Sequence, residues 1–190
     1  MSKAKFSDSE LIQKVLAGEI ELFGVLIDRY EKLVFSFLMT RVKQLQEVED
    51  IAQETFVKAF KHLKSFDCDK KFAAWLLTIA RNIMIDQLRR NNRNIASTEM
   101  VTEVMLKDGK SSDTNPQTLA IRKEEFKKVV DMIYGLPEEV REPFVLRIVN
   151  GLSYQEISEA LELPLQTIKN RIFKARTMLR DKREKHEEMP

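Results

Sequence analysis

The chain has 190 residues, of which 43% are hydrophobic, and its formal net charge is only +2. That apolar content is enough for one globular domain or two small ones, with two favoured, and the near-neutral charge excludes a uniformly basic coat for nucleic acid. The single Cys68 excludes an internal disulfide and a cysteine-cluster metal site, so we expect no metal and no cofactor.

The N-terminal sequence and the hydropathy pattern predict neither export nor membrane insertion. Residues 1–15 lack the apolar core of a signal peptide, and no apolar run approaches the roughly 18 residues that a membrane span requires. We therefore expect a soluble protein of the reducing cytoplasm. Only five Gly and five Pro, with few alternating β-branched runs, predict an all-α fold.

The chain begins with a short predicted helix, which Ser7 or Ser9 can cap and which Gly18 ends. A longer helix is predicted over 22–42. It is apolar on more than one side, which is typical of a helix at the centre of a bundle or at a partner interface. We favour the core for its apolar residues, which are Phe23, Val25, Leu26, Ile27, Tyr30, Leu33, Val34, Phe35, Phe37, Leu38 and Met39.

Residues 47–63 predict an amphipathic helix in which acids lead and lysines trail. That order matches the helix dipole by itself, so the outward charges fit a solvated face as well as a protein-docking surface. The residues predicted to face inward are Val48, Ile51, Ala52, Phe56, Ala59, Phe60 and Leu63. The outward residues are Asp50, Gln53, Glu54 and Val57.

Residues 72–90 predict a helix that is apolar around most of its circumference. Its polar remnant is a strip of cations, hydroxyl and amide beside the loop 64–71, and such a strip can track a nucleic-acid backbone while a base is stacked or pocketed nearby. Trp75 is expected in the core, as is usual for tryptophan, whereas Phe66 suits the core and base stacking equally. The strip consists of Lys71, Thr78, Arg81, Asn82 and Arg89.

Periodicity fails over residues 91–115, which favours a flexible tether between two units that each bury a core. Pro116 begins the next predicted helix, which ends near Gly135, and Pro137 opens another. Pro143 lacks a backbone donor, so we expect a kink or a late helix start there. The residues of these two helices expected to face inward are Leu119, Phe126, Val129, Val130, Ile133, Val140, Phe144, Val145 and Ile148.

Residues 151–180 predict two short helices joined by a tight turn, a helix-turn-helix. Ser153 and Glu156 can form a capping box, and Pro164 suits the first turn of the second helix. The second helix has an inner stripe of Leu165, Ile168, Ile172, Ala175 and Leu179. Its outer face comprises Gln166, Lys169, Asn170, Phe173, Lys174, Arg176 and Arg180.

That outer face mixes cations for phosphates with amides and one aromatic ring, which can contact base edges in a major groove. An ordinary solvated face on a helical hairpin is the alternative. Residues 165–185 contain eight Lys or Arg against two acids, and this bias, together with the turn chemistry, favours DNA binding.

Three motifs, taken together, resemble bacterial RNA polymerase sigma factors of the small extracytoplasmic-function (ECF) group of the sigma-70 family. They are EVEDIAQETFVKAF at 47–60, FAAWLLTIARNIMIDQLRR at 72–90 and LPEEVREPFVLRIVNGLSYQEISEALELPLQTIKNRIFKARTMLR at 136–180. Their order, with a linker between the second and the third, is far more specific than a lone helix-turn-helix, and the resemblance covers nearly the whole chain. It implies a transcription initiation factor without catalysis of its own, which binds core RNA polymerase, directs it to promoters and assists promoter opening.

The resemblance implies two small helical domains joined by a flexible linker: sigma region 2 over 1–95, the linker over 96–115, sigma region 4 over 116–185 and a tail over 186–190. It also implies three binding surfaces. The surface for core polymerase consists of Asp50, Gln53, Glu54 and Val57. The surface for the −10 element, including the loop that holds a flipped base, contains Phe66, Lys71, Thr78, Arg81, Asn82 and Arg89. The surface for the −35 element contains Gln166, Thr167, Lys169, Asn170, Arg171, Phe173 and Lys174.

The partners implied by the resemblance are core RNA polymerase, through its β′ coiled coil and its β flap, promoter DNA and, as often in the family, an anti-sigma factor. Glu162 and Gln166 depart from the family pattern, which usually has glycines around this turn. A stand-alone helix-turn-helix regulator, with residues 1–95 as a dimerisation or sensing module, is the alternative function. A helical enzyme acting on nucleic acid is disfavoured, because no phosphate-binding loop, metal cluster or nucleophile–base pair is visible.

Overall fold

The computed structural model describes residues 6–42, 44–91 and 116–187, and every regular element among them is helical. The all-α prediction is therefore confirmed for the described residues. The predicted linker over 96–115 lies outside them, as does the end of the predicted tail at 188–190. The α-helices are α1 (Asp8–Leu16), α2 (Phe23–Leu38), α3 (Leu45–His62), α4 (Phe72–Asn91), α6 (Pro116–Tyr134), α7 (Glu138–Ile148), α8 (Tyr154–Leu161) and α9 (Leu165–Glu187). The single-turn 3₁₀ helices are η2 (Ile20–Leu22) and η3 (Leu63–Ser65).

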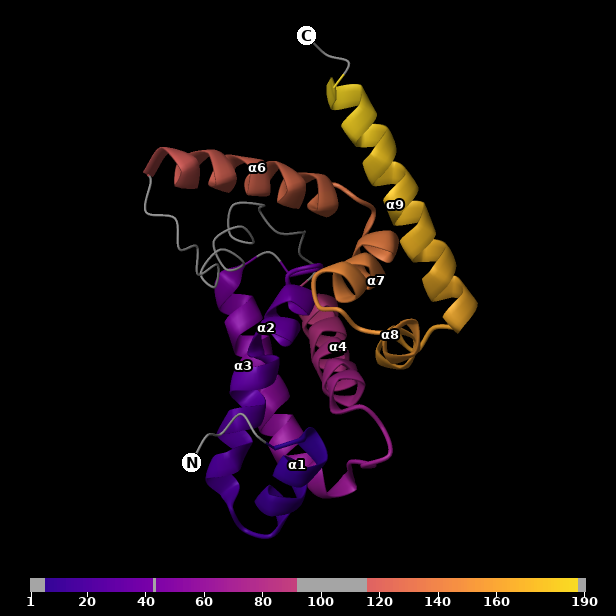
Figure 1. Ribbon diagram of the computed structural model, residues 1–190. Helices are drawn as coiled ribbons and strands as arrows, with labels where there is room; N and C mark the ends of the chain where they lie inside the picture. Colours follow the sequence, from indigo (N-terminus) through magenta and orange to yellow (C-terminus); the bar gives the residue numbers. More distant parts are fainter. Residues whose placement is uncertain (1–5, 43, 92–115, 188–190) are drawn as a thin grey trace.

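Two groups of helices lie against each other (Figure 1). Helices α1 to α4 form the N-terminal unit, in which α2, α3 and α4 pack together and α1 packs on α2. Helices α6 to α9 form the C-terminal unit, in which α9 contacts each of the other three. One contiguous hydrophobic cluster includes buried residues of both units, so the two units share part of a core.

Helix α1 is capped by Ser7, one of the two serines that the sequence offers as a cap, and the cap is a full capping box. The Oγ of Ser7 accepts a hydrogen bond from the backbone N–H of Glu10 at 3.3 Å, and the Glu10 carboxylate accepts one from the backbone N–H of Ser7 at 2.7 Å. The box pairs two amide donors that the first turn of a helix leaves free. Gly18 follows the helix end with φ +112°, a conformation that only glycine adopts at little cost.

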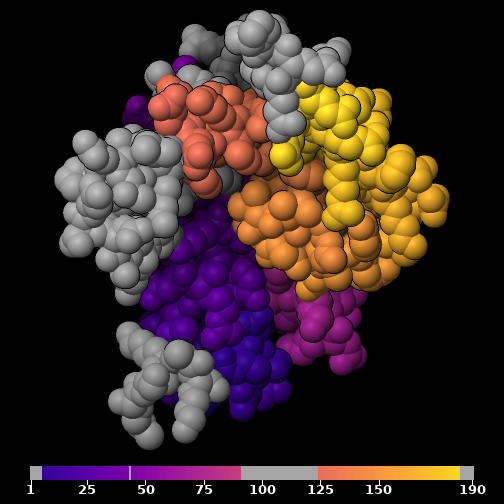
Figure 2. All heavy atoms as spheres, turned by 45° about the horizontal axis from the view of Figure 1, so that its top comes forward, coloured from indigo at the N-terminus to yellow at the C-terminus, as the bar shows by residue number. Residues whose placement is uncertain are grey.

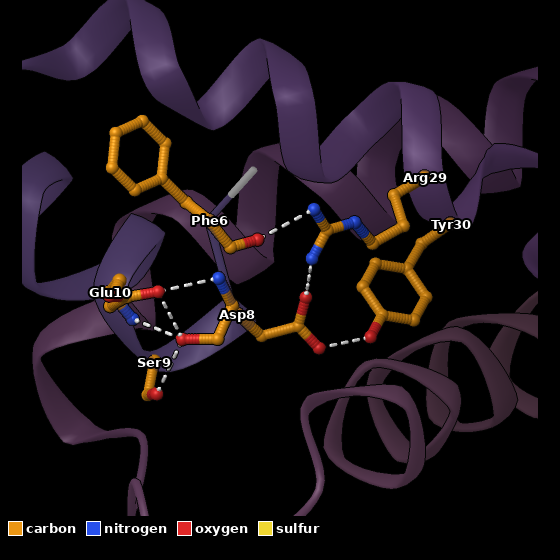
Figure 3. A network of polar contacts seen from close by, with 7 residues as sticks. Phe6, Asp8, Ser9, Glu10, Arg29 and Tyr30 are labelled. Carbon is orange, nitrogen blue, oxygen red and sulfur yellow. Dashed lines mark hydrogen bonds and ion pairs between the residues drawn. The ribbon is translucent and has the colours of Figure 1, made fainter. Parts of the chain in front are cut away.

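A polar network fixes the N-terminal segment to α2 (Figure 3). The carboxylate of Asp8 accepts hydrogen bonds from the Arg29 guanidinium and from the Tyr30 hydroxyl, both on α2. The Arg29 guanidinium also donates to the backbone carbonyl of Phe6 at 2.9 Å. Burial, together with the hydrogen bond to Asp8, raises the pKa of Tyr30, so its hydroxyl remains a donor at neutral pH.

Helix α2 is shorter than the predicted helix over 22–42. It ends at Leu38, and a turn follows over 39–41. Thr40 is fully buried in this turn, and its hydroxyl donates to the carbonyl of Phe37 at 2.6 Å, which competes with the helical pattern for that acceptor. The apolar residues predicted for the core along this helix are all buried or half-buried, so that part of the prediction is confirmed.

Three residues predicted to face inward are exposed instead, namely Phe60 (42%), Val129 (47%) and Ile148 (49%). Phe60 lies in the last turn of α3 and packs on one side only, against Phe23 with ring centroids 5.0 Å apart. Val129 lies on α6, which buries a narrow face around Val130. Ile148 is the last residue of α7, where the chain leaves the packed layer. For these three residues the predicted inward position is wrong.

Pro143 lies inside α7, but it does not delay the helix. The helix begins at Glu138, directly after the N-cap Pro137, so the late start that we considered does not occur. The proline removes one backbone donor from the helix interior. Burial of α7 residues on both sides of it, including Val140 and Phe144, offsets that loss through packing against the rest of the protein.

Charged side chains, two of them buried, join the two units. Arg41, in the turn after α2, pairs with Glu138 at 3.0 Å and with Glu142 at 3.1 Å, both on α7. From the other side, Arg141 of α7 donates to the backbone carbonyl of Thr40 at 2.6 Å. Burial raises the pKa of Glu142, whose residue is only 2% exposed, and the Arg41 charge opposes that rise.

Replacing Glu142 by Gln should change the pH dependence of stability. Because the pKa of Glu142 is raised by folding, the native state binds this proton more tightly than the unfolded chain between the ordinary pKa of 4.5 and the raised one. The wild-type protein therefore gains stability as the pH falls through this window, and Gln, which does not titrate, lacks the gain. Urea unfolding across the window should show the free energy of unfolding of the wild type, relative to Glu142→Gln, rising as the pH falls. A pH-independent difference would contradict the assignment.

Candidate nucleic-acid and protein interfaces

The four residues predicted to dock a protein share the outward side of α3, which we name the docking face. Asp50, Gln53 and Val57 are exposed. Glu54 is half-buried and pairs with Lys58 one turn later at 2.7 Å. Spacings of three and four residues place the four side chains on consecutive turns. Two carboxylates, an amide and an apolar group suit a protein partner better than DNA, because carboxylates repel phosphates.

An apolar groove of about 510 Å³ opens beside the docking face, between α2 and α3. Gln53 and Val57 belong to both surfaces, and the exposed ring of Phe60 forms part of the groove wall. The groove was not predicted, because Phe60 was expected in the core. The position of Phe60, three residues after the outward-facing Val57, could have indicated that Phe60 is exposed. The remaining wall is largely aromatic and aliphatic, with Phe23, Ile27, Phe35 and Phe56.

The predicted nucleic-acid strip runs along one side of α4. Lys71 directly precedes the helix, and Asn82 and Arg89 are exposed on it. Thr78 is half-buried, and its hydroxyl donates to the backbone carbonyl four residues earlier at 3.0 Å. Arg81 lies at the edge of the strip nearest to the C-terminal unit. The structure therefore brings all five residues to one side of a single helix.

Arg81 forms an ion pair with the C-terminal unit. Its Nη1 donates to Oε2 of Glu162 at 2.8 Å, across the boundary between α4 and the end of α8. The Arg81 side chain keeps 24% of its surface exposed, against 59% for Glu162. This ion pair joins residues 81 positions apart in the sequence, and no local pattern in the chain predicted it.

Phe66 belongs to an aromatic cluster at the start of α4. Its ring centroid lies 5.0 Å from that of Trp75 and 5.5 Å from that of Phe72. Phe72 is buried, whereas Phe66 and Trp75 are half-buried. Trp75 therefore packs largely with the core, as expected. Phe66 packs against it, so the loop 64–71 carries a supported aromatic surface rather than a free ring.

Helices α8 and α9 form the predicted helix-turn-helix. The Oγ of Ser153 accepts a hydrogen bond from the backbone N–H of Glu156 at 3.2 Å, and the Glu156 carboxylate accepts one from the N–H of Ser153 at 2.8 Å. Glu162 ends α8 in the left-handed conformation, with φ 53° and ψ 43°. This conformation favours glycine and costs another residue on the order of 1 kcal/mol. The turn therefore keeps the geometry expected of a glycine while it presents a carboxylate.

Helix α9 has the inner and outer sides that the sequence predicts. Its inner stripe is buried or half-buried, and Thr167 and Arg171 are half-buried at the edge. Phe173 lies on the outer side and is 72% exposed, so a large apolar surface is in contact with water. The exposed outer residues, which we name the recognition face, are Gln166, Lys169, Asn170, Phe173, Lys174, Arg176 and Arg180.

Local contacts order part of the recognition face. The Gln166 amide donates to Oδ1 of Asn170 at 2.9 Å, and Lys174 reaches Glu139 of α7 at 3.5 Å. A hollow of about 370 Å³ lies beside Phe173, with Lys169 and Arg176 in its wall. Amide, cation and exposed ring thus sit on one helix side, where they can meet base edges and phosphates together.

The described part of the chain lacks two other kinds of site. Among these residues, no group of three or more His, Cys, Asp or Glu could hold a metal ion. No described helix is long and apolar enough to cross a bilayer.

Comparisons with known proteins agree with this geometry. Residues 26–94 match the family model of Sigma-70 region 2, and residues 126–179 match that of Sigma-70 region 4. The ECF RNA polymerase sigma-E factor of Haemophilus influenzae is 30% identical over 186 residues, which cover 94% of this chain and 96% of the relative. The ECF RNA polymerase sigma factor SigW of Bacillus subtilis is 31% identical over 175 residues, or 89% of this chain and 92% of the relative.

The structure of CnrH in complex with the cytosolic domain of CnrY is also similar, with a TM-score of 0.66 and 27% identity over 93% of this chain and 97% of that one. Two family regions in the expected order, and relatives of nearly equal length, account for almost the whole sequence. The chain therefore belongs to the sigma-70 family, in its ECF group of RNA polymerase sigma factors.

Proposed function

We propose that this transcription initiation factor divides its work among three surfaces: the docking face of α3 for core RNA polymerase, the α4 strip for the −10 element and the recognition face of α9 for the −35 element. The observation that carries the proposal is the segregation of charge. An acidic surface lies on one helix and a basic surface on another, within a chain of net charge only +2. A single uniform binding surface would not need this separation.

The docking face fits a partner that offers cations beside apolar side chains. Asp50 and Glu54 supply the carboxylates, and Val57 continues into the apolar groove with Phe60. Buried apolar contacts supply affinity, whereas charges set orientation and association rate. We assign this surface to the β′ coiled coil of the polymerase, and we assign the β flap as the contact of the C-terminal unit.

The recognition face fits a closed duplex. Lys169 and Lys174 suit phosphates, Asn170 suits an adenine edge, and the exposed ring of Phe173 suits a thymine methyl. Gln166, Thr167 and Arg171 flank them on the same helix.

The α4 strip fits DNA that is already open. Arg81, Asn82 and Arg89 line a backbone track, and Lys71 leads to the aromatic cluster that contains Phe66. Taking a base out of the duplex stack costs a few kcal/mol, so the polymerase contacts must supply part of that energy. We expect no catalytic activity of the protein itself.

The domain organisation that we propose follows the sequence boundaries: region 2 over 1–95, a linker over 96–115 and region 4 over 116–185, with a tail over 186–190. Two weak DNA-reading modules in one chain gain affinity through effective concentration once both sit on the polymerase. The protein would act in the cytoplasm, where polymerase and chromosome are. The solved structure of CnrH is a complex with the cytosolic domain of CnrY, so a protein partner is a candidate here too, and we propose that it is the anti-sigma factor that the sequence resemblance implies.

Reversing the charge of the docking face should abolish polymerase binding. The variant is Asp50→Lys with Glu54→Lys, and we expect affinity for purified core polymerase to fall by more than about tenfold, because two carboxylates would become cations facing the partner's cations. Native gels and run-off transcription from a genomic library measure binding and activity. Wild type should bind promoter fragments tightly only when core polymerase is present.

The matched control is Glu124→Lys with Glu125→Lys, two exposed acids on α6. It carries the same charge change and should retain polymerase binding. Full activity of the docking-face variant would remove the α3 assignment. Tight, site-specific duplex binding by the wild-type protein without polymerase would instead favour the stand-alone regulator.

Removing cations from the recognition face should weaken duplex binding without affecting polymerase binding. For Lys169→Ala and Lys174→Ala, we expect each holoenzyme to bind an active promoter more weakly. The slope of log affinity against log salt should shrink by about one for each phosphate that the variant no longer neutralises. Lys128→Ala on α6 is the control. Unchanged salt slopes in both variants would show that these lysines do not touch DNA.

A further inference from the structure

The loop 64–71, which directly precedes α4, has a single inward-facing side chain. All of its residues except Phe66 are exposed, and Phe66 is half-buried. The turn in the middle of the loop is held locally, since the backbone N–H of Asp69 donates to Oδ1 of Asp67 at 3.1 Å. Because an exposed loop gains little from burial, its order depends on the residues that fix its two ends.

Phe72, the first residue of α4, fixes the C-terminal end of the loop. Its ring is only 2% exposed and contacts two further rings, with centroids 5.3 Å from that of Tyr30 and 5.5 Å from that of Phe66. Phe66 meets Phe72 edge to face. Rings at these distances attract each other beyond the effect of burial alone. Tyr30 of α2 therefore supports, through Phe72, the one loop residue that packs inward.

Asp8 fixes the orientation of Tyr30. The carboxylate of Asp8, the first residue of α1, accepts hydrogen bonds from the Tyr30 hydroxyl and from the Arg29 guanidinium, and Figure 3 shows the three side chains pointing toward one another. A hydrogen bond to an ionised acceptor is stronger than a neutral one. The Tyr30 ring therefore has a preferred orientation against Phe72, and that orientation depends on the N-terminal segment of the chain.

Helix α1 also contacts the other end of the loop. It packs against η3, which opens the loop, and the buried Leu11 and Ile12 of α1 belong with Leu63 of η3 to one hydrophobic cluster. Figure 1 shows α1 beside the segment that joins α3 to α4, and Figure 2 shows the indigo surface of the N-terminal segment at the opposite end of the molecule from α6. The main contacts of α1 are with η2, α2 and η3, all in the N-terminal unit.

We propose that the N-terminal segment 6–16 positions the loop 64–71 for base binding, with Asp8 and Tyr30 as positioning residues. The inference rests on the proposed assignment of this loop to the flipped base of the −10 element. Both residues act through others: Asp8 orients Tyr30, and Tyr30 supports Phe72. An ordered loop loses less conformational entropy when the base binds, so the network raises the affinity for the base. The match to Sigma-70 region 2 begins at residue 26, so α1 lies outside it.

Two substitutions in the full chain test the proposal. Asp8→Asn removes the charge, and Tyr30→Phe removes only the hydroxyl and leaves the ring against Phe72. Tyr30→Phe also keeps Asp8 in the first turn of α1, where its charge favours the helix dipole, so this variant separates positioning from helix stability. The control is Glu19→Gln, which removes a carboxylate from an ion pair with Lys14 at 2.9 Å. Circular dichroism shows that each variant keeps its helices.

The first readout is the mobility of a nitroxide label on the native Cys68, the single cysteine of the chain, which is exposed in the loop. Electron paramagnetic resonance of the free protein resolves mobile and immobile label. In Asp8→Asn and Tyr30→Phe the ratio of mobile to immobile label should rise about two- to tenfold, which is the effect of losing one hydrogen bond. The Glu19→Gln protein should match the wild type.

The second readout is base binding by the holoenzyme. Promoter templates are opened in advance by mismatches over the −10 element, and each carries one abasic site at a successive position of the non-template strand. With wild type, the abasic site at the flipped position should weaken binding at least about fivefold, because one stacked base is lost. In both test variants this penalty should shrink at least about twofold. A merely structural defect weakens binding to every template alike and leaves the penalty unchanged.

The outcomes separate the inference from the proposed function. A wild-type holoenzyme that tolerates an abasic site at every position would contradict the proposed role of the loop, and the inference with it. Where wild type shows the penalty, unchanged label mobility and an unchanged penalty in both Asp8→Asn and Tyr30→Phe would overturn the inference alone. A change in only one of the two readouts would also overturn it, as would an equal change in Glu19→Gln.

Discussion

Helix α4 carries apolar side chains on two sides, and both sides must pack against other helices. The arrangement of those helices follows from that constraint. The buried residues of α4 are too widely spread around the helix to face one neighbour. They are Phe72, Ala73, Ala74, Leu76, Leu77, Ala80, Ile83 and Met84. Helices α2 and α3 cover one part, and α8 lies along another. The apolar surface of α4 thus stabilises the packing of the C-terminal unit against the N-terminal unit.

Charge places the three proposed functions on different helices. The docking face is acidic and adjoins an apolar groove, the recognition face is basic and amide-rich, and the α4 strip carries cations beside an aromatic cluster. The recognition face is exposed in the structure, whereas Arg81 of the α4 strip is paired with a carboxylate of the C-terminal unit.

Local features were predictable from the sequence, and long-range partners were not. Both capping boxes, at Ser7 and Ser153, follow from a serine and a glutamate three residues apart, and the two sides of α9 follow from spacings of three and four. The apolar excess of α4 indicated a second cover but not which helix supplies it. The pairing of Arg81 with Glu162 depends on how two units pack, which no local pattern contains. The prediction for Phe60 failed because its ring packs against Phe23 at the wall of the groove and stays 42% exposed, a position that helical periodicity does not distinguish from the core.

The central claim is that the docking face of α3 and the recognition face of α9 bind different partners. The most direct test places a photo-crosslinker on Val57→Cys or on Phe173→Cys, each in a Cys68→Ser background, in the complex of the chain with core RNA polymerase and promoter DNA. The account predicts that the label at position 57 crosslinks to polymerase and the label at position 173 to DNA. Crosslinking of position 57 to DNA, or of position 173 to polymerase alone, would contradict it.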